Sequence, residues 1–278
     1  MTEFPSLDDR FKGLPRSLRE KSRITRLGAD VPALVAHPGD GAPCPWVLWL
    51  HGRTVYKELD PGRYARWVRA GIGAVALDLP GHGERAEDGA DAPERTVEVV
   101  TRALGEIDGV LDDVRSLGTF DMDRVAMGGM SAGGMVTLRR LCDPHPFVAA
   151  TVEGTSGDLA RLYFPGAGDP DTGIARVTHD PAEVERIDPS AHLDGFEPVP
   201  LLALHTRGDE MVPFEVQTRF LDRLREHYER RGADASMVEL ETFENTGAPG
   251  EHAGFGKDAS RAKDAQLAFL SRVLGTGA

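Results

Sequence analysis

The sequence predicts an α/β fold with a mostly parallel sheet and helices on both faces. Two observations carry this prediction. Strand-like apolar runs alternate with helix-like apolar stripes along the chain. Several of these runs are apolar at every position, which is typical of strands buried on both faces. The chain has 278 residues, and we expect residues 1–278 to form a single domain.

Eight runs are expected to form strands. The first two are short and close together, which is typical of a hairpin. The last run alternates apolar and polar residues, so it is expected nearer an edge of the sheet. The predicted strands are 24–27, 31–36, 46–50, 72–77, 124–127, 147–151, 199–204 and 237–243.

Three helices are predicted from apolar residues at helical spacing. The clearest stripe has gaps of three and four residues and is formed by Val97, Val100, Leu104, Ile107, Leu111 and Val114. A second stripe comprises Val216, Phe220 and Leu224, and the third helix is expected at 257–274.

Two further segments stand out. Residues 155–191 are rich in Gly, Asp and Pro and show no convincing strand, which predicts a small lid insertion; the alternative is a solvated insertion. In the first 20 residues, apolar positions at helical spacing are interrupted by Pro5, Gly13 and Pro15. We expect 1–20 to be an arm packed on the body, with a homodimer contact as the alternative.

Composition excludes several classes of protein. The 45 acidic residues outnumber the 32 basic ones, so the net charge of −13 disfavours nucleic acid as a partner. The longest apolar stretches fall short of the roughly 20 residues that span a bilayer, so no membrane partner is expected. The two cysteines, Cys44 and Cys142, form no CxxC pair, and no signal peptide is expected at the N-terminus. These features predict a cytoplasmic protein.

Residues 129–133, Gly-Met-Ser-Ala-Gly, form a G-x-S-x-G sequence between a predicted strand and the helical pattern TLRRLC. A tight turn at this place presents the Ser hydroxyl at the carboxyl edge of the sheet, and the small flanking glycines allow the crowded backbone. The N-terminus of the helix adds free N–H groups beside that hydroxyl. The setting predicts Ser131 as a nucleophile; the alternative is an ordinary Gly-rich turn.

A serine nucleophile needs a histidine base, which should follow it in the chain. Six histidines do so: His145, His179, His192, His205, His227 and His252. His227 lies in a helical pattern and is expected to face solvent, and His205 ends a strand, where it is expected to pack or brace a loop. His252 lies in Gly-Glu-His-Ala-Gly, a loop after the last strand that can reach the serine. We therefore predict His252 as the base; the alternative is a solvated loop histidine.

The base needs an orienting carboxylate, expected after a strand between the serine and the histidine. Asp209 lies in the turn that follows the predicted strand at 199–204, with Glu210 beside it. Asp188 and Asp194 precede that strand and suit the role less well. We predict Asp209 as the acid; the alternative is a turn aspartate that satisfies its own backbone.

An oxyanion intermediate needs hydrogen-bond donors. The backbone N–H of Ala132, the residue after the predicted nucleophile, is one candidate. The second is expected in the loop after the 46–50 strand, where Gly52 lets the backbone bend close and Arg53 offers its N–H.

Taken together, these motifs resemble the α/β-hydrolase superfamily, in particular its dienelactone hydrolase and prolyl-oligopeptidase-like branch of small bacterial serine esterases. The resemblance covers about residue 31 to the C-terminus, with Ser131 where dienelactone hydrolases carry Cys. It implies an eight-stranded, mostly parallel sheet, a triad of Ser131, Asp209 and His252, and an oxyanion hole at Arg53 and Ala132. Many members of this branch carry an apolar residue in place of Arg53, which suggests the hypothesis that the Arg53 side chain contacts an acidic or polar acyl group. The motifs, in the expected order, are HGRT at 51–54, DLPGHGER at 78–85, GMSAG at 129–133, HTRGDEMVP at 205–213 and GEHAGF at 250–255.

The sequence therefore predicts a carboxylesterase that acts on a small-molecule ester through an acyl-enzyme, without a cofactor. Two alternatives stay open: an amidase, peptidase or thioesterase with the same triad, and a non-catalytic binding protein of the same fold. Residues 81–86 match the dinucleotide pattern GxGxxA, but the polar, Pro-broken stretch that follows disfavours NAD. No HExxH or HxH spacing is present, so no metal is expected.

Overall fold

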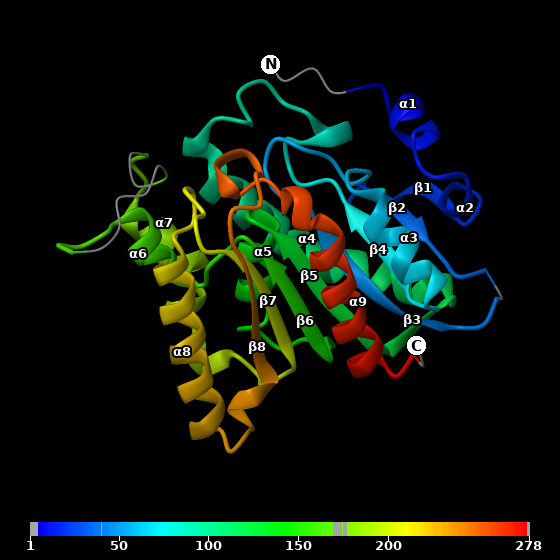
Figure 1. The fold of residues 1–278 in the computed structure, drawn as a ribbon. Coiled ribbons are helices and arrows are strands. Elements are labelled where there is room, and N and C mark those ends of the chain that lie inside the picture. Colours follow the sequence, from blue (N-terminus) through cyan, green and yellow to red (C-terminus); the bar gives the residue numbers. More distant parts are fainter. Residues whose placement is uncertain (1–4, 40, 169–173, 175–176, 277–278) are drawn as a thin grey trace.

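The computed structural model describes residues 5–39, 41–168, 174 and 177–276. Its centre is an eight-stranded sheet with the order β1-β2-β4-β3-β5-β6-β7-β8 (Figure 1). β2 pairs antiparallel with β1 and β4, and all other neighbouring strands are parallel. The strands are β1 (Ser22–Leu27), β2 (Val31–Ala36), β3 (Cys44–Leu50), β4 (Gly73–Leu77), β5 (Phe120–Met130), β6 (Ala149–Glu153), β7 (Leu201–Thr206) and β8 (Val238–Phe243).

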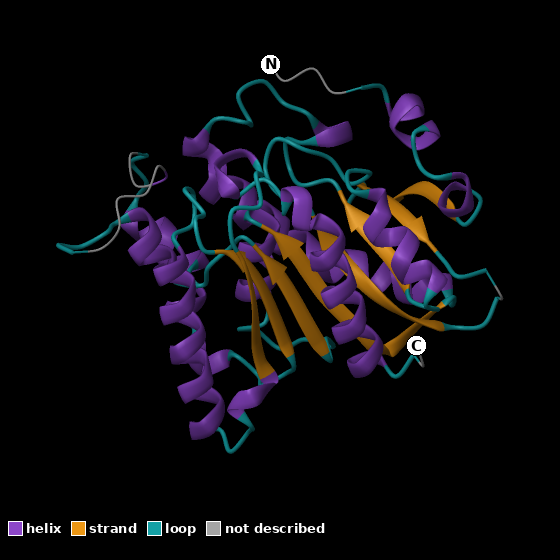
Figure 2. Ribbon diagram, viewed as in Figure 1, coloured by secondary structure: helices purple, strands orange, loops and turns teal. Residues whose placement is uncertain are grey.

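Helices connect the strands and cover both faces of the sheet, as Figure 2 shows. The α-helices are α1 (Leu7–Lys12), α2 (Arg16–Arg19), α3 (Pro61–Arg69), α4 (Thr96–Leu117), α5 (Ala132–Arg140), α6 (Leu159–Tyr163), α7 (Pro181–Ile187), α8 (Phe214–Arg230) and α9 (Ala259–Leu274). Among the described residues, no helix combines the length and the apolar character needed to cross a membrane.

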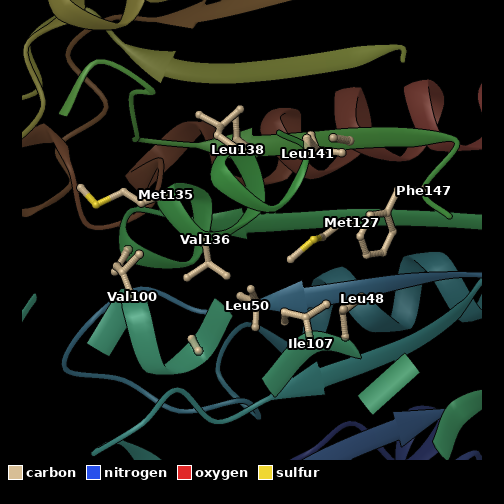
Figure 3. Packing of buried hydrophobic residues seen from close by; sticks show 14 of the residues in the cluster. Leu48, Leu50, Val100, Ile107, Met127, Met135, Val136, Leu138, Leu141 and Phe147 are labelled. Carbon is tan, nitrogen blue, oxygen red and sulfur yellow. The ribbon is translucent and has the colours of Figure 1, made fainter. Parts of the chain in front are cut away.

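Two apolar cores sandwich the sheet, because successive side chains of a strand point to opposite faces. In β3, Leu48 and Leu50 join α4, α5, α7 and α8 in one core, while Val47 and Trp49 join α3 and α9 in the other. Figure 3 shows part of the first core, where Leu50 and Ile107 lie close to Met127 and Val136. β3 is buried along its whole length, which is why its sequence is apolar throughout.

The predicted fold class is confirmed: the sheet is mostly parallel, has eight strands and is covered on both faces. Each predicted strand lies within or overlaps an observed one, the first two pair as a hairpin, and β8 lies at an edge. The three predicted helices correspond to α4, α8 and α9. In α4, Leu104 is half-buried, and the other five residues of the stripe are buried.

Some boundaries were predicted wrongly. β6 lies two residues further along than the predicted 147–151 and ends on Glu153, a buried carboxylate that the apolar pattern could not include. β5 begins at Phe120, because polar residues before Arg124 continue the strand past the apolar run. α3 was not predicted, since its buried side includes a charged residue, Arg63, beside Tyr64 and Trp67.

The 155–191 segment contains α6 and α7 in its described part. Asp188 joins the two helices: its carboxylate accepts the N–H groups of Leu159 and Ala160 at 3.1 and 2.9 Å. Burial raises the pKa of Asp188. Residues 169–173 and 175–176 of the predicted lid insertion lie outside the described residues. The N-terminal arm forms α1 and α2, separated by Gly13 and Pro15, as its interrupted pattern indicates.

Candidate active site

The strand–turn–helix at β5 and α5 places Ser131 on a strained backbone. Its φ of 52° and ψ of −116° are unusual for a residue with a side chain. The Ser131 N–H donates to the carbonyl of Glu153 at 2.8 Å, and the Ser131 carbonyl accepts from the Met135 N–H at 2.9 Å. The turn is therefore fastened to β6 on one side and starts α5 on the other, so the hydroxyl is presented at the carboxyl edge of the sheet.

The glycine that ends the G-x-S-x-G sequence is required by a close approach of two backbones. A Cβ at Gly133 would lie 2.2 Å from the Leu50 carbonyl oxygen and 2.6 Å from that of His51. Neither of these backbone atoms can move aside as a flexible side chain could. The first turn of α5 thus packs directly on the end of β3, which brings the 51–53 loop to the serine.

The three predicted triad side chains lie in one hydrogen-bonded row. His252 Nε2 lies 2.9 Å from Ser131 Oγ, and His252 Nδ1 lies 2.8 Å from Asp209 Oδ2. Because Nδ1 faces a carboxylate, it carries the proton, and Nε2 is left to accept one from the serine. The Asp209 side chain is 1% exposed and that of His252 is 13% exposed. The arrangement can transfer a proton from a hydroxyl to an imidazole that a buried carboxylate orients.

The carboxylate is held by the turn that follows β7. Asp209 Oδ1 accepts the backbone N–H groups of Met211 and Val212 at 2.9 and 2.8 Å. The turn is also braced from β7, where His205 Nε2 donates to the Val212 carbonyl at 2.8 Å. Burial lowers the pKa of His205, which keeps this ring neutral beside the acid. His205 thus braces a loop, as its position in the sequence predicts.

The loop that carries His252 is ordered by its neighbour Glu251. The Glu251 carboxylate accepts the N–H groups of Thr246 and Gly247 at 2.7 and 2.8 Å. Burial alone would raise the pKa of Glu251, but the bonds from Gly247 and Thr246 together outweigh it and lower the pKa. The Glu210 N–H donates to the Gly250 carbonyl at 3.0 Å. This bond links the loop of the acid to the loop of the histidine.

The end of β6 touches all three triad residues, and sequence reasoning missed it. Besides the bond from Ser131 to Glu153, the Thr155 hydroxyl donates to the Ser131 carbonyl at 3.0 Å. Gly154 has a φ of +50°, and a Cβ there would lie 3.5 Å from the His252 ring and 3.6 Å from Asp209 Oδ2. The only sequence signal was the Gly that directly follows the strand.

Behind this segment, a buried ion pair holds the Glu153 side chain. Arg63 of α3 binds both Glu153 oxygens, through Nη1 and, at 2.9 Å, through Nη2. Nη1 also donates to Gln266 and Nη2 to Asp60, so the terminal nitrogens are engaged. Burial alone would lower the pKa of Arg63, but Glu153 and Asp60 outweigh it and raise the pKa. The terminal nitrogens of Arg63 are thus used within the protein, and its side chain forms part of the wall of the site.

The two backbone segments predicted to supply the oxyanion donors border the same cavity as the serine. Gly52, Arg53 and Ala132 all line this cavity, whose volume is about 720 Å³. A Cβ at Gly52 would lie 3.5 Å from the Cβ of Ser131. The loop after β3 and the first residue of α5 therefore flank the hydroxyl.

The Arg53 side chain points to a neighbouring loop. Nη1 donates to the Thr96 hydroxyl at 2.6 Å, and Nη2 donates to the carbonyls of Ala92 and Ala90 at 2.7 and 3.3 Å. Burial lowers the pKa of Arg53. These contacts disfavour the hypothesis that this side chain binds an acidic or polar acyl group, because its outer nitrogens already hold the 90–96 loop in place.

The cavity beside Ser131 is mainly apolar. Its walls include the side chains of Val55, Leu59, Met130, Met135, Met211 and Phe255. Charged residues at one end are paired with each other: Lys263 Nζ lies 2.8 Å from Asp60 Oδ1, next to the Arg63–Glu153 pair. Such a cavity can accommodate an uncharged, apolar group bonded to a carbonyl carbon that faces the serine.

Two other candidates from the sequence lie elsewhere. Asp188 caps α6, as described above, and is not part of the hydrogen-bonded row. His227 is 3% exposed and donates through Nε2 to the Phe196 carbonyl at 2.8 Å, so the prediction that it faces solvent is wrong. The α8 helix, which carries His227, buries more of its surface against the core than its many charged residues indicated.

Within the described ranges, no cluster of three or more His, Cys, Asp or Glu side chains could hold a metal ion.

The fold and this site define the class of protein: a serine hydrolase with the α/β-hydrolase fold. Residues 62–277 match the prolyl oligopeptidase family, and the chain belongs to that family. It is 27% identical over 207 residues to the esterase YjfP of Escherichia coli, covering 71% of this chain and 82% of the relative. It is 25% identical over 193 residues to the putative esterase YitV of Bacillus subtilis, covering 66% and 76%.

A solved structure shows the same fold in a longer protein. A puromycin-hydrolyzing peptidase of Mycobacterium tuberculosis superposes on 92% of this chain with a TM-score of 0.67 and 23% identity. The chain spans 40% of the length of that peptidase. The resemblance noted from the motifs is thereby confirmed at the level of fold and family.

Proposed function

We propose that this serine hydrolase is a carboxylesterase, with Ser131 as nucleophile, His252 as base and Asp209 as the acid that orients it. The observation that carries the proposal is the hydrogen-bonded row from hydroxyl through imidazole to buried carboxylate. The names of the relatives YjfP and YitV, an esterase and a putative esterase, support the same substrate class.

In the first half-reaction, Ser131 Oγ attacks the ester carbonyl carbon while His252 Nε2 takes the hydroxyl proton. Asp209 accepts the Nδ1–H bond throughout and stabilises the imidazolium. The carbonyl oxygen becomes an oxyanion, for which we propose the backbone N–H groups of Arg53 and Ala132 as donors. The C–O bond to the alcohol then breaks, and the imidazolium returns its proton to the departing alkoxide. An acyl-serine remains.

In the second half-reaction, a water molecule takes the place of the alcohol. His252 Nε2 accepts a proton from this water as its oxygen attacks the acyl carbon, again forming an oxyanion. Collapse of the intermediate breaks the bond to Ser131 Oγ, which takes the proton back from the imidazolium. The products are a carboxylic acid and the regenerated hydroxyl, so the cycle needs no cofactor.

The cavity supports an ester with an uncharged, apolar acyl group. Each of three cations along its wall is already engaged by protein oxygens: Arg53 by the 90–96 loop, Arg63 by Glu153, and Lys263 by Asp60. A negatively charged acyl group would therefore have to compete with these protein oxygens for the terminal nitrogens of the three cations. Amide or peptide and thioester cleavage by the same triad remain the alternative activities, and the substrate panel below separates them.

A cytoplasmic location and a small-molecule substrate are part of the proposal. Both cysteines, Cys44 and Cys142, are free and buried, which suits a reducing compartment. The net charge of −13 argues against nucleic acid as a partner. A homodimer through the N-terminal arm stays a prediction, which sedimentation of the purified chain would test.

The test is a panel of p-nitrophenyl esters from acetyl to octanoyl, with matching anilides and thioesters, assayed on wild type and on Ser131→Ala. We expect the esters to be hydrolysed fastest, with a loss of about 10⁴-fold or more in Ser131→Ala. Ser116→Ala, at an exposed serine on α4, is the matched control and should retain full activity. Faster cleavage of anilides or thioesters would favour the alternative activities, and an active Ser131→Ala would refute the proposed mechanism.

A further inference from the structure

A buried cluster of charges lies behind the 51–60 segment. Lys57 is fully buried, and its Nζ lies 2.9 Å from Asp78 Oδ2 and 2.9 Å from Glu58 Oε1, and also contacts Glu84. Burial would lower the pKa of Lys57, but Asp78 and Glu58 outweigh it and raise the pKa. One lysine thus faces three carboxylates, so the cluster holds more negative than positive charge, and further positive charge stabilises it.

The N-terminal arm supplies that charge through Arg10 of α1. Arg10 Nη1 lies 3.2 Å from Glu58 Oε2, and the two side chains are 4% and 1% exposed. The guanidinium also lies over the ring of Tyr56, 4.9 Å from its centroid. Arg26 reaches Glu84 on the other side at 3.3 Å but is 45% exposed. Arg10 is therefore the buried cation that balances Glu58.

The segment held in this way forms a wall of the candidate active site. Val55, Leu59 and Asp60 line the cavity beside Ser131, as do the loop residues Gly52 and Arg53 that precede them. Between β3 and α3 this wall has no regular secondary structure, so it depends on side-chain contacts for its position. Its centre is fixed at Lys57, whose N–H donates to Asp78 Oδ1 at 2.9 Å and whose carbonyl accepts from the Tyr64 hydroxyl at 2.9 Å.

We propose that Arg10 is a positioning residue for the active site: by neutralising Glu58, the N-terminal arm holds the 51–60 wall against the cavity. The proposal rests on the proposed function, because the wall carries Arg53, the proposed second oxyanion donor. It assigns the arm a role within its own chain. Since Arg10 is already buried against Glu58 and Tyr56, this side of α1 is not free to contact a second copy.

The test compares Arg10→Gln and Arg10→Lys with a matched control, Arg16→Gln, which removes an exposed pair with Glu20 on the same arm. A fluorophosphonate titrates the active sites, and kcat and KM are measured for p-nitrophenyl butyrate. We expect Arg10→Gln to lower kcat per titrated site at least tenfold with less change in KM. Arg10→Lys should recover most of that loss, and Arg16→Gln should match wild type.

A second variant separates charge compensation from loss of packing. Arg10→Gln leaves Glu58 buried with only Lys57, which it shares with Asp78 and Glu84, as a cationic partner. Adding Glu58→Gln removes the excess negative charge. We expect the double variant to be more active than Arg10→Gln alone. A double variant no better than the single one would overturn the charge-balance argument.

Hydrogen exchange gives a readout that does not depend on activity. We expect faster exchange in Arg10→Gln at amides of 51–60, the Lys57 amide above all, with core strands such as β5 unchanged. Equal kcat and equal local exchange in Arg10→Gln and Arg16→Gln would overturn the proposal, as would faster exchange throughout the chain with unchanged kcat. If wild type showed no Ser131-dependent hydrolysis, the proposed function would fail, and local exchange would still decide whether Arg10 holds the wall.

Discussion

At the scale of single residues, the candidate site depends on backbone positions as much as on the three triad side chains. Gly154 lies between β6 and the histidine, in a conformation with positive φ that allows close contact with His252 and Asp209. An alanine at this position would have to adopt the same positive φ, and its methyl group would touch both side chains. We therefore expect this methyl group to disturb the geometry of proton transfer between Ser131 and His252.

We predict that Gly154→Ala lowers kcat about tenfold or more and destabilises the fold by about 1 kcal/mol. Gly118→Ala is the matched control, because Gly118 also has a positive φ, of 66°, but no atom within 4 Å of the added Cβ. The control should lose similar stability and keep its kcat. Equal kcat in the two variants would show that Gly154 does not shape the site.

The buried ring of His82 makes stability depend on pH. Burial lowers the pKa of His82 to about 4, while its Nδ1 faces the Pro80 carbonyl at 2.8 Å. Between pH 6.5 and 4 the unfolded chain therefore binds a proton that the folded protein does not. The contribution of His82 to the free energy of unfolding is fully present above about pH 6.5 and is lost as the pH is lowered toward 4.

We predict that wild type loses about 1–2 kcal/mol of unfolding free energy from His82 alone between pH 7 and pH 5. His82→Asn should lose that much less over the same interval, as measured by urea unfolding at both pH values. His145, His179 and His205 also have lowered pKa values and contribute with the same sign in both proteins. Equal pH dependence in the two proteins would contradict the assignment to His82.

At the scale of elements, the Arg63–Glu153 pair joins α3 to the end of β6, and Gln266 of α9 completes it. The Glu153 carbonyl also accepts the Ser131 N–H, so the same residue fastens the turn that carries Ser131. Removing one partner of a buried pair leaves an uncompensated charge, whereas removing both does not.

We predict that Arg63→Met destabilises the protein by about 3–5 kcal/mol, measured by urea unfolding. The double variant Arg63→Met with Glu153→Gln should be clearly more stable than Arg63→Met alone. Arg66→Met is a matched control on the same helix, since the Arg66–Asp264 pair is more exposed. A double variant as unstable as the single one would show that the pair acts through packing and not through charge.

The same elements show what the sequence could and could not predict. β3 and β4 were located closely because full burial makes every residue apolar, and the α4 stripe followed from helical spacing. The loops carrying Ser131, Asp209 and His252 were located because each follows a strand. Arg63 and Glu153 were missed, since they are 90 residues apart and each alone is typical of a solvated surface. Arg10 was missed for the same reason.

At the scale of the whole molecule, the candidate site is assembled at one edge of the sheet from loops that are far apart in sequence. Parallel strands bring the ends of β3, β5, β6 and β7 to this edge, and the long loop after β8 returns His252 to Ser131. The N-terminal arm contacts the 51–60 wall through Arg10, and α3 contributes Arg63 to the lining of the same cavity. The proposed mechanism requires that this convergence make Ser131 a covalent nucleophile.

The most direct test of this role of Ser131 is mass spectrometry of the protein quenched in acid during turnover of p-nitrophenyl butyrate. We predict a butyryl adduct on the peptide that contains Ser131, formed in step with a burst of p-nitrophenol. His252→Ala should accumulate this adduct far more slowly. Turnover without an adduct on that peptide would refute the proposed mechanism, as would an adduct on another residue while Ser131→Ala stays active.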